Sequence, residues 1–406
     1  MSKAATATRV RIGFVSGAGL LALAMALAGC GAAAARAGSA STNSPGGITA
    51  PALATSLAVP GGASWAVVQM GGSAARHDNF WELFVRPAGS ASWKLATPAG
   101  VATNGGLVMT ASGSGSLLAG FRPSQKLTFS PLAATTDAGA NWSQNDVLDA
   151  GLADVPGALA TGPEGRLLAI TDTSKVETGA PGGASWTRLT TEQALARTAA
   201  GRSCGLIALT AAAWTPAGQP LLAGDCRSIG TAAIFGLRAG TWQAAGPSLP
   251  AALRREPISV IGLNAAGPRI TAILAAGTGR STAVLAAWSA DNGSTWTMSP
   301  PLTTGPATAG PPSISFGADG SASLLLPAGH AASGGAVIGW RAGGWQSLPR
   351  LPAGATTLAA TAAGQPEALA VQGGTLRVWQ LGSSHGPSPW TLLQTVQVTI
   401  PYGSSG

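Results

Sequence analysis

Carboxylates are the side chains of this chain that could carry out hydrolysis in pairs. The 406 residues include 15 Asp and Glu. Two carboxyl groups about 5 to 9.5 Å apart can cleave a glycosidic bond, one as the acid and the other as nucleophile or base. We interpret most of the candidates as solvated turn carboxylates, the usual setting beside Gly or Asn, as for Asp78, Asp225 and Asp319, and no pair stands out. The candidates are Asp78, Glu82, Asp172, Glu177, Asp225, Glu256, Asp319 and Glu367.

Metal-dependent and nucleophilic chemistry have less support in the sequence. The three histidines, His77, His330 and His385, are scattered and form no motif with metal-ligand spacing, so we predict no metal site and no cofactor. A serine or cysteine triad lacks its elbow motif. The segment 76–81, RHDNFW, is the most polar and aromatic of the expected loops, and we interpret it as an exposed loop in preference to a ligand contact. The run 254–256, RRE, is interpreted as a solvated connection.

Two short motifs have a regular spacing that fits a turn. SADNGSTW runs from Ser289 to Trp296, and TTDAGANW runs from Thr135 to Trp142. In such a turn the aspartate accepts hydrogen bonds from backbone N–H groups, and the glycine adopts a positive φ. The tryptophan then begins the next strand and covers apolar surface. We therefore expect both motifs to join strands and both aspartates to be structural.

Tryptophans mark an internal repeat along the whole chain. Seven of them occupy similar frames, such as GASWTRL and AGTWQAA, at intervals of about 50 residues. Each copy contains four apolar runs of strand length, separated by Gly, Pro, Asn and Asp, the composition of hairpin turns. The fourth copy is expected to begin its first strand at Cys204. The tryptophans are Trp93, Trp142, Trp186, Trp242, Trp296, Trp345 and Trp390.

Four short strands in each of seven units predict an all-β fold, a β-propeller with seven blades. No stretch after the N-terminal segment shows helical periodicity, so we expect no helices. The first copy has a poorly defined inner strand. The segment 52–59 or the terminal IPYG could add a strand where the last blade meets the first, and the sequence does not choose between them.

The turn motifs resemble the Asp-box, or BNR, repeat found in sialidases and in many propellers with other roles. The fuller match comprises Ser289, Asp291, Gly293, Thr295 and Trp296. The second match comprises Thr135, Asp137, Gly139 and Trp142, with Asn141 in place of Thr or Ser. The resemblance implies a box that is structural and lies away from the active face. Sialidases also use a tyrosine nucleophile, and here the single tyrosine, Tyr402, stands five residues from the C-terminus.

The first 29 residues are typical of a targeting signal. Lys3, Arg9 and Arg11 precede a mostly apolar stretch, 12–27. The residues 27–30 then read Leu-Ala-Gly-Cys. This stretch resembles the lipobox of bacterial lipoproteins, which implies acylation of Cys30 and a location on the outer face of the cytoplasmic membrane or in the envelope. An ordinary signal peptide with an incidental cysteine, or an uncleaved anchor, is the alternative.

The sequence therefore divides into three parts. Residues 1–29 are the signal, 30–51 are the acylated cysteine and a linker of Ala, Gly, Ser, Thr, Asn and Pro, and 52–406 are the propeller. The linker has too little apolar surface to fold and is expected to be a tether. In the exported part Cys204 and Cys226 are the remaining cysteines, and we predict a disulfide between them.

Charge narrows the classes of partner. Removal of the signal lowers the net charge from +8 to +5, because it takes away three basic residues and no acidic ones. The remaining basic residues form no run, so nucleic acid is not an expected partner. We predict a monomeric, non-catalytic binding or scaffold module for an envelope protein or glycan. The alternatives are a divergent glycoside hydrolase with carboxylates in the central channel and, by fold analogy alone, an assembly factor.

Overall fold

The chain separates into two compact units, Met1–Gly47 and Ile48–Gly406. In the computed structural model every described residue belongs to the second unit, so the predicted signal, Cys30 and the whole predicted linker, 30–51, lie outside the described residues. The described residues are 54–71, 79–98, 107–121, 132–144, 152, 154–227, 230–277, 282–304, 312–326, 337–341, 344–362, 364–382 and 389–398.

The strands fall into seven consecutive groups of four, each an antiparallel meander. The first four groups are β1 (Ala54–Ala58), β2 (Ser64–Gly71), β3 (Asn79–Arg86) and β4 (Lys94–Leu95); β5 (Leu107–Ser112), β6 (Ser116–Phe121), β7 (Leu132–Thr135) and β8 (Ser143–Gln144); β9 (Pro156–Thr161), β10 (Leu167–Thr171), β11 (Lys175–Gly179) and β12 (Trp186–Thr191); and β13 (Leu206–Trp214), β14 (Pro220–Cys226), β15 (Ile234–Arg238) and β16 (Thr241–Ala244).

The last three groups follow the same order, with one additional short strand, β21 (Leu302–Thr304), paired with β19. They are β17 (Ile258–Ala266), β18 (Arg269–Ala276), β19 (Thr282–Ser289) and β20 (Thr297–Met298); β22 (Ser313–Phe316), β23 (Ala322–Leu325), β24 (Val337–Arg341) and β25 (Gly344–Leu348); and β26 (Thr357–Ala360), β27 (Pro366–Gln372), β28 (Thr375–Leu381) and β29 (Trp390–Gln397).

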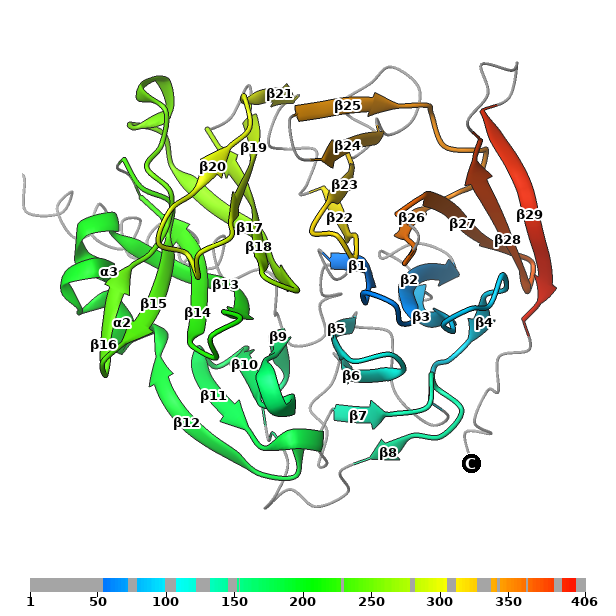
Figure 1. Cartoon of the computed structure of the whole chain (residues 1–406), viewed down its shortest axis with the longest axis horizontal. Coiled ribbons are helices and arrows are strands. Elements are labelled where there is room, and N and C mark those ends of the chain that lie inside the picture. Colours follow the sequence, from blue (N-terminus) through cyan, green and yellow to red (C-terminus); the bar gives the residue numbers. More distant parts are fainter. Residues whose placement is uncertain are drawn as a thin grey trace, which may run out of the picture. The chain divides into compact units, whose positions relative to one another are not determined.

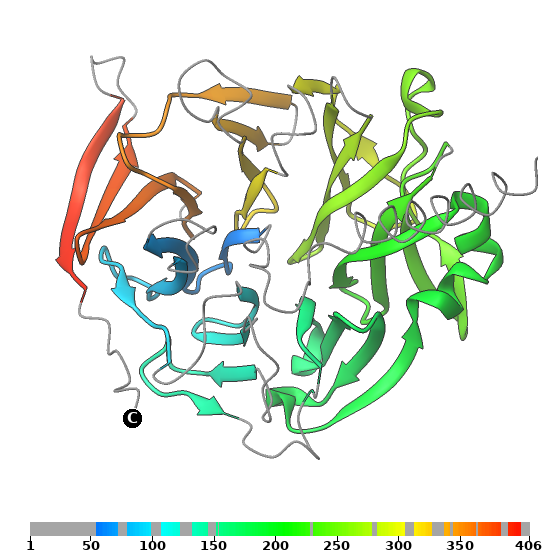
Figure 2. The same cartoon turned by 180° about the vertical axis from the view of Figure 1, so that it is seen from behind.

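Within this unit the seven groups stand in a ring, with the first strand of each nearest the axis (Figures 1 and 2). The predicted β-propeller is therefore confirmed, and we number its blades one to seven in chain order. Seven buried apolar clusters occupy the interfaces, one between each pair of neighbouring blades, including blades seven and one.

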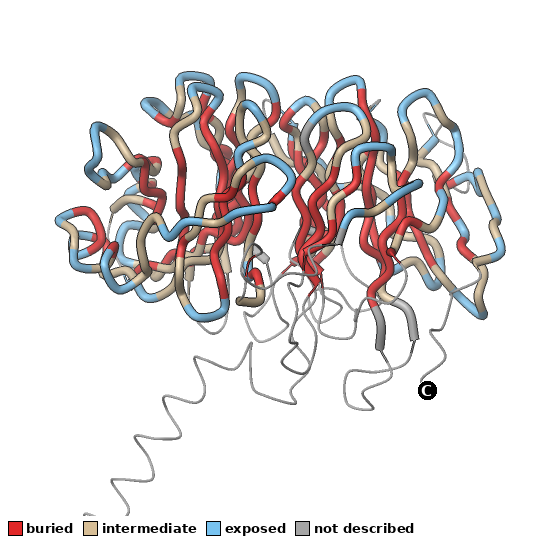
Figure 3. Tube along the Cα trace, turned by 90° about the horizontal axis from the view of Figure 1, so that it is seen from below, coloured by how far each residue is buried: buried red, intermediate tan, exposed pale blue. Residues whose placement is uncertain are grey.

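The position of each blade between two neighbours explains the apolar runs in the sequence. Successive side chains of a strand point to opposite faces of its sheet. On β2, Trp65 and Val67 pack toward blade two, whereas Ala66 and Val68 pack toward blade seven. A strand buried on both faces becomes continuously apolar, as β10 is, and Figure 3 shows this buried layer through the middle of the blades.

Strand order divides the ring into two faces. Because neighbouring strands run antiparallel, the connections after the first and third strands of every blade lie on one face, which we call the turn face. The connections after the second and fourth strands lie on the other, which we call the loop face. The described connections of the turn face are mostly tight turns, such as 113–115 and 267–268. Innermost strands, β1 included, begin on the loop face.

The repeated tryptophans pack against the preceding blade, and in blades five and six the indole N–H also bonds to it. The Trp296 indole N–H of blade five donates to the Ala245 carbonyl of blade four at 2.7 Å. The Trp345 indole N–H of blade six donates to the Pro300 carbonyl of blade five at 3.1 Å. Both tryptophans stand at the start of the outermost strand, as the sequence predicted, and this position brings each ring against the preceding blade.

Every described blade consists of one continuous stretch of chain, so the ring closes without exchange of a strand. The segment 52–59 supplies β1, the innermost strand of blade one, and β1 also pairs in parallel with β22 of blade six. The Thr55 hydroxyl adds a hydrogen bond to the Ile314 carbonyl. The other candidate for closure, IPYG, lies outside the described residues.

A buried carboxylate joins the last blade to the first. Glu367 on β27 has a fully buried side chain, and it accepts hydrogen bonds from the Trp93 indole N–H at 2.6 Å and from the guanidinium of Arg86. Gln394 on β29 bonds both the N–H and the carbonyl of Trp93, at 2.8 and 2.9 Å. The closing interface thus uses the same tryptophan bond as other interfaces, with a carboxylate as its acceptor.

The sequence missed two helices in the connection between blades three and four. They are α2 (Glu192–Ala196) and α3 (Ala199–Cys204). The described residues also include 3₁₀ turns in other connections: η2 (Pro163–Gly165), η3 (Pro181–Gly183) and η4 (Ala251–Leu253). Thr191 and Thr198 cap the two α-helices with their hydroxyls. Helices of five and six residues are too short to show a hydrophobic period, so the sequence pattern did not reveal them.

We predict that Glu367→Gln lowers the free energy of unfolding by about 3 kcal/mol. The new amide N–H₂ would face Arg86 or the Trp93 indole, both donors, and would leave one of them without an acceptor in a buried site. Denaturant unfolding followed by tryptophan fluorescence measures the loss. Glu164→Gln, on an exposed turn, is the matched control and should change the value by less than about 0.5 kcal/mol. Equal stability of the two variants would contradict the role of Glu367.

Candidate functional site

The axis of the ring offers no ionisable chemistry on its innermost strands. The described strands β1, β5, β9, β13, β17, β22 and β26 contain no Asp, Glu, Lys, Arg or His. Their polar residues are Ser, Thr and Asn. A pair of channel carboxylates was the feature that would have favoured a glycosidase, and these strands do not supply it.

Four of the candidate carboxylates, Glu177 among them, lie in strands, not in the solvated turns that the sequence suggested. Glu82 lies on β3, Asp225 on β14 and Glu367 on β27. Burial raises the pKa of Glu82, while the Thr97 hydroxyl opposes the rise. Burial likewise raises the pKa of Asp225, opposed by a hydrogen bond from the Ser259 hydroxyl. No hydrogen bond or ion pair among the described residues joins any two of these three groups, whose bonded partners are other residues.

The other candidates sit in the settings that the sequence indicated or near an ion pair. Asp319 lies in a turn, where the Ser321 N–H donates to it at 2.9 Å. Glu256 is on the connection 254–256, whose two arginines are exposed as predicted. Burial raises the pKa of Glu177 on β11, and the charge of Lys175 opposes the rise. Lys175 itself forms an ion pair with Asp154 at 2.6 Å.

The segment 76–81 is only partly a loop. Asp78 and His77 lie outside the described residues, whereas Asn79, Phe80 and Trp81 begin β3. Trp81 is 3% exposed and packs in the apolar cluster between blades one and two. The expectation of an exposed aromatic loop was therefore wrong for Trp81, because a strand periodicity that starts at Asn79 was not separated from the polar residues before it.

The turn from Ser289 to Trp296 joins β19 and β20 on the turn face, and its side chains bond to its own backbone. The Ser289 hydroxyl donates to Asp291 at 2.8 Å and accepts from the Gly293 N–H at 2.9 Å. Asp291 accepts from the N–H of Thr295 at 2.8 Å and from its hydroxyl at 2.6 Å. Gly293 has a φ of +79°. Both carboxylate oxygens are thus engaged in holding the turn.

The turn from Thr135 to Trp142 repeats this geometry with one exchange. Thr135 and Asp137 hydrogen bond at 2.8 Å, and the Gly139 N–H donates to the Thr135 hydroxyl at 3.1 Å. Asn141 donates to Asp137 through its N–H at 2.9 Å and through its side-chain amide at 2.7 Å. The amide therefore takes the place of the Thr295 hydroxyl, which explains how this departure from the Asp-box pattern is accommodated.

We predict that acid weakens these two turns between about pH 4 and pH 2. The hydrogen bonds lower the pKa of Asp137 and of Asp291 from 3.8 to about 2. A carboxyl whose folded pKa is depressed stabilises the fold above its unfolded pKa, and this contribution is lost as pH falls through the folded value. The double variant Asp137→Asn, Asp291→Asn should therefore have a lower Tm at pH 6 and a shallower fall of Tm from pH 4 to 2. Parallel Tm curves for variant and parent would contradict this assignment.

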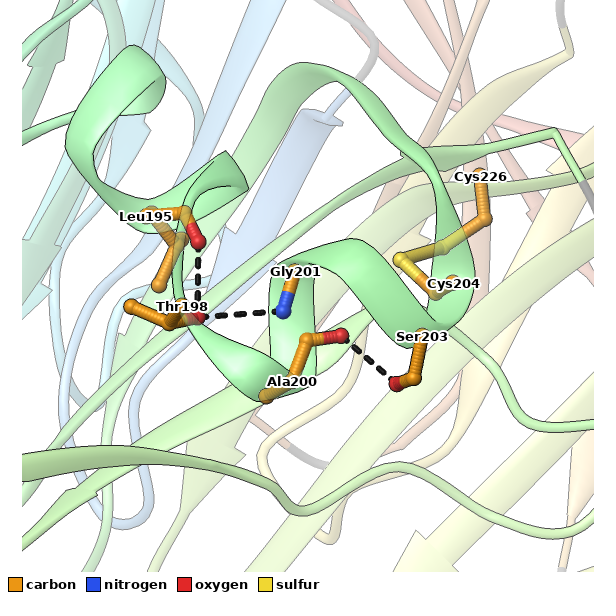
Figure 4. Close-up of a disulfide and its surroundings, with 7 residues drawn as sticks. All are labelled: Leu195, Thr198, Ala200, Gly201, Ser203, Cys204 and Cys226. Carbon is orange, nitrogen blue, oxygen red and sulfur yellow. Dashed lines mark hydrogen bonds between the residues drawn. A yellow bond between two sulfur atoms is a disulfide. The ribbon is translucent and has the colours of Figure 1, made fainter.

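The disulfide predicted between Cys204 and Cys226 is present, with a Cα–Cα distance of 5.3 Å. Its position differs from the expectation, because Cys204 ends helix α3 and the first strand of blade four starts only at Leu206. The bond therefore fixes α3 to the end of β14 (Figure 4). The Thr198 hydroxyl, which accepts from the Gly201 N–H and donates to the Leu195 carbonyl, holds α2 and α3 together beside it.

We predict that Cys204→Ala with Cys226→Ala lowers the free energy of unfolding by about 3 kcal/mol, because the bond closes a loop of about 23 residues in the unfolded chain. Denaturant midpoints with and without reductant measure the effect. The parent should move to the variant's midpoint on reduction, and the variant should not move. If the denaturant midpoint of the parent does not change on complete reduction, the disulfide has no stabilising role.

Exposed arginines gather on the loop face of blades three to five. They lie on the connections that carry α2, α3 and η4 and at the end of β14, and all are exposed: Arg197, Arg202, Arg227, Arg254 and Arg255. Ile207 at the start of β13, with 47% of its surface exposed, lies on the same face. We call these six residues the basic sector.

The outer edge of blade seven is the second open surface. Its strand β29 has eight residues, whereas the outermost strands β4, β8 and β20 have two each. It contains no charged residue, Gly or Pro. A bulge opposite Val378 and Trp379 leaves Leu392 and Leu393 exposed by 53% and 42%. No described strand pairs with its free edge, which makes this edge a template for an added strand.

Two kinds of site are missing from the described residues. No group of three or more His, Cys, Asp or Glu is placed to hold a metal ion there. Nor does any helix in those ranges combine the length and hydropathy needed to cross a membrane.

Comparison with known proteins gives a likeness of fold and no family. No family model matches the chain, and no curated protein matches it. Among solved structures, YCF48 bound to D1 peptide is 18% identical over 75% of this chain and 96% of its own, with a TM-score of 0.39. YCF48 from Cyanidioschyzon merolae is 13% identical over 82% and 94%, with a TM-score of 0.42. The six-bladed lectin of Aleuria aurantia is 16% identical over 73% and 96%, with a TM-score of 0.37.

Proposed function

We propose that this chain is a lipid-anchored, extracytoplasmic propeller that acts as a non-catalytic binding or scaffold module for a protein or glycan of the cell envelope. The anchor is Cys30, which follows the charged, apolar and small-residue segments of a lipoprotein signal. The disulfide between Cys204 and Cys226 supports a location outside the cytoplasm, where such bonds persist.

The observation that carries a binding role is the contrast between the axis and the rim. The described innermost strands have no ionisable side chain, and the carboxylates Glu82, Asp225 and Glu367 lie on strands of three different blades, one, four and seven. Large apolar side chains are instead exposed on the outer strand β29. A rigid ring with an inert axis and an open edge suits recognition better than hydrolysis.

The edge of β29 favours a protein over a glycan as the partner. An extended peptide can add to an open strand through main-chain hydrogen bonds, with alternate side chains setting specificity. Leu392 and Leu393 offer apolar contact area beside the unpaired backbone groups. Oligosaccharides lack the regularly spaced N–H and C=O groups that such an edge requires.

The proposal predicts a discrete protein crosslink at the edge of blade seven. The full chain carrying a photoreactive side chain in place of Leu393 is produced in bacterial cells and irradiated, and the adducts are separated and identified. The matched control carries the same group in place of Gln346, which is exposed on the outer strand β25 of blade six. We expect a defined protein adduct from position 393 and none from position 346.

Hydrolysis is measured on the same protein with a panel of envelope oligosaccharides and an assay for new reducing ends. We expect no release. Cleavage that survives purification would replace the binding proposal with a glycosidase. Equal adducts from both positions, or adducts from neither, would remove β29 as the binding edge.

A further inference from the structure

The arginines of the turn face and those of the loop face have different partners. On the turn face, arginines bond one blade to the next: Arg166 donates to the Gly218 carbonyl and Arg269 to the Asp319 carbonyl, both at 3.2 Å, and Arg341 to the Gly364 carbonyl at 2.6 Å. These bonds join blades three to four, five to six, and six to seven. Their guanidinium groups are thus part of the ring's own structure.

The five arginines of the basic sector form no such bridge. Arg202 donates to the Arg197 carbonyl and Arg254 to the Leu249 carbonyl, each within its own connection. The two ion pairs of the described residues, Arg86 with Glu367 and Lys175 with Asp154, involve none of the five. Their positive charges are therefore available to an anion outside the chain.

The carboxylates of the same region compensate this charge only in part. Glu192, Asp225 and Glu256 are half-buried, and Asp172, on the connection after β10, is the exposed acid among the described residues there, against five exposed arginines. Glu192 accepts the Leu209 N–H at 2.9 Å, and Asp225 accepts the Ser259 hydroxyl. The solvent-facing charge of the sector is consequently positive.

The chain enters the propeller on this same face. β1 is followed by the turn 59–63 on the turn face, so its first residue, Ala54, lies on the loop face. Ala54 lies 24 positions after Cys30, a length of chain that reaches at most about 80 Å when fully extended. The described chain therefore begins on the loop face, the face that also carries the basic sector.

We infer that the basic sector binds the phosphate groups of anionic phospholipids and lays the loop face on the membrane surface. Charge complementarity, the exposed Ile207 and the entry point of the tether all point to a lipid surface as the occupant. One lipid chain alone holds a protein weakly, and a basic patch is a common second attachment. The orientation rests on the anchor proposed above; the affinity of the sector for anionic headgroups does not.

The test uses the full acylated chain on vesicles of phosphatidylcholine, with or without 30% phosphatidylglycerol. A photoreactive side chain replaces Ile207, and lipid adducts are counted after irradiation. We expect adducts with the anionic vesicles and at least fivefold fewer with the neutral ones. High salt should abolish the difference, because it screens exposed charges.

Charge variants distinguish binding through the basic sector from a general effect of the protein's net charge. Arg254→Gln with Arg255→Gln should lower the adduct yield, and affinity for an anionic surface is expected to fall about fivefold for each arginine removed. The control removes the same charge from exposed positions outside the sector, Arg188→Gln on β12 with Arg377→Gln on β28, and should keep the parent yield. Equal losses in the two variants would show an effect of net charge alone and overturn the sector.

Co-flotation with the vesicles separates this inference from the proposed anchor. A chain that floats with neutral vesicles retains its anchor. If that chain gives no lipid adduct at position 207 with anionic vesicles, the inference that the basic sector binds lipid is refuted. A Cys30→Ser chain that ignores neutral vesicles yet floats with anionic ones in a salt-sensitive manner supports the sector without help from the anchor. A Cys30→Ser chain that floats with neither vesicle, but binds a soluble acidic glycan or peptide through the same arginines, identifies another ligand and overturns the lipid assignment.

Discussion

A ring of sheets exposes two apolar interfaces unless its last blade bonds to its first, and this closure is the constraint on which the propeller depends. The tryptophan that begins each outer strand is placed against the preceding blade, and in blades five and six its indole N–H donates to a carbonyl there. At the closing interface the acceptor is the carboxylate of Glu367, shared with Arg86. A charged acceptor makes a stronger hydrogen bond, and its burial makes the loss of either partner costly.

Closure by side chains leaves every described blade contiguous in sequence. This arrangement explains why the repeat was readable. Each unit carries its own four apolar runs and its own tryptophan, so period and strand order follow from local residues. The two Asp-box-like turns were predictable for the same reason, since the bonds between the Ser or Thr, the Asp and the turn backbone lie within eight residues. Their assignment to the Asp-box family stays a prediction, as does the lipid on Cys30.

What the sequence could not give depends on distant partners. Glu82, Asp225 and Glu367 were taken for turn carboxylates because their neighbours in sequence do not reveal burial, and the groups that bond to them come from elsewhere in the chain. For Glu367 those groups are Arg86 and Trp93, and the Arg86 contact spans 281 residues. The helices α2 and α3 are stabilised by threonine caps and by the disulfide, not by an amphipathic pattern of their own. The basic sector likewise combines arginines from three separate connections, so no continuous run of basic residues in the sequence indicated it.

The pairing of β1 with β22 sets the order in which the axis can be completed. These strands are joined by a hydrogen bond between residues 259 apart in sequence, and contacts of such separation form late because a long loop must close first. One edge of β1 therefore stays unpaired until β22 of the sixth blade has formed. The strands of blades two to five pair with strands close to them in sequence, whereas blade one acquires its full set of partners only when nearly the whole chain is present. An interrupted or truncated chain would thus leave its N-terminal strand open, which marks an incomplete molecule at the end nearest the predicted tether.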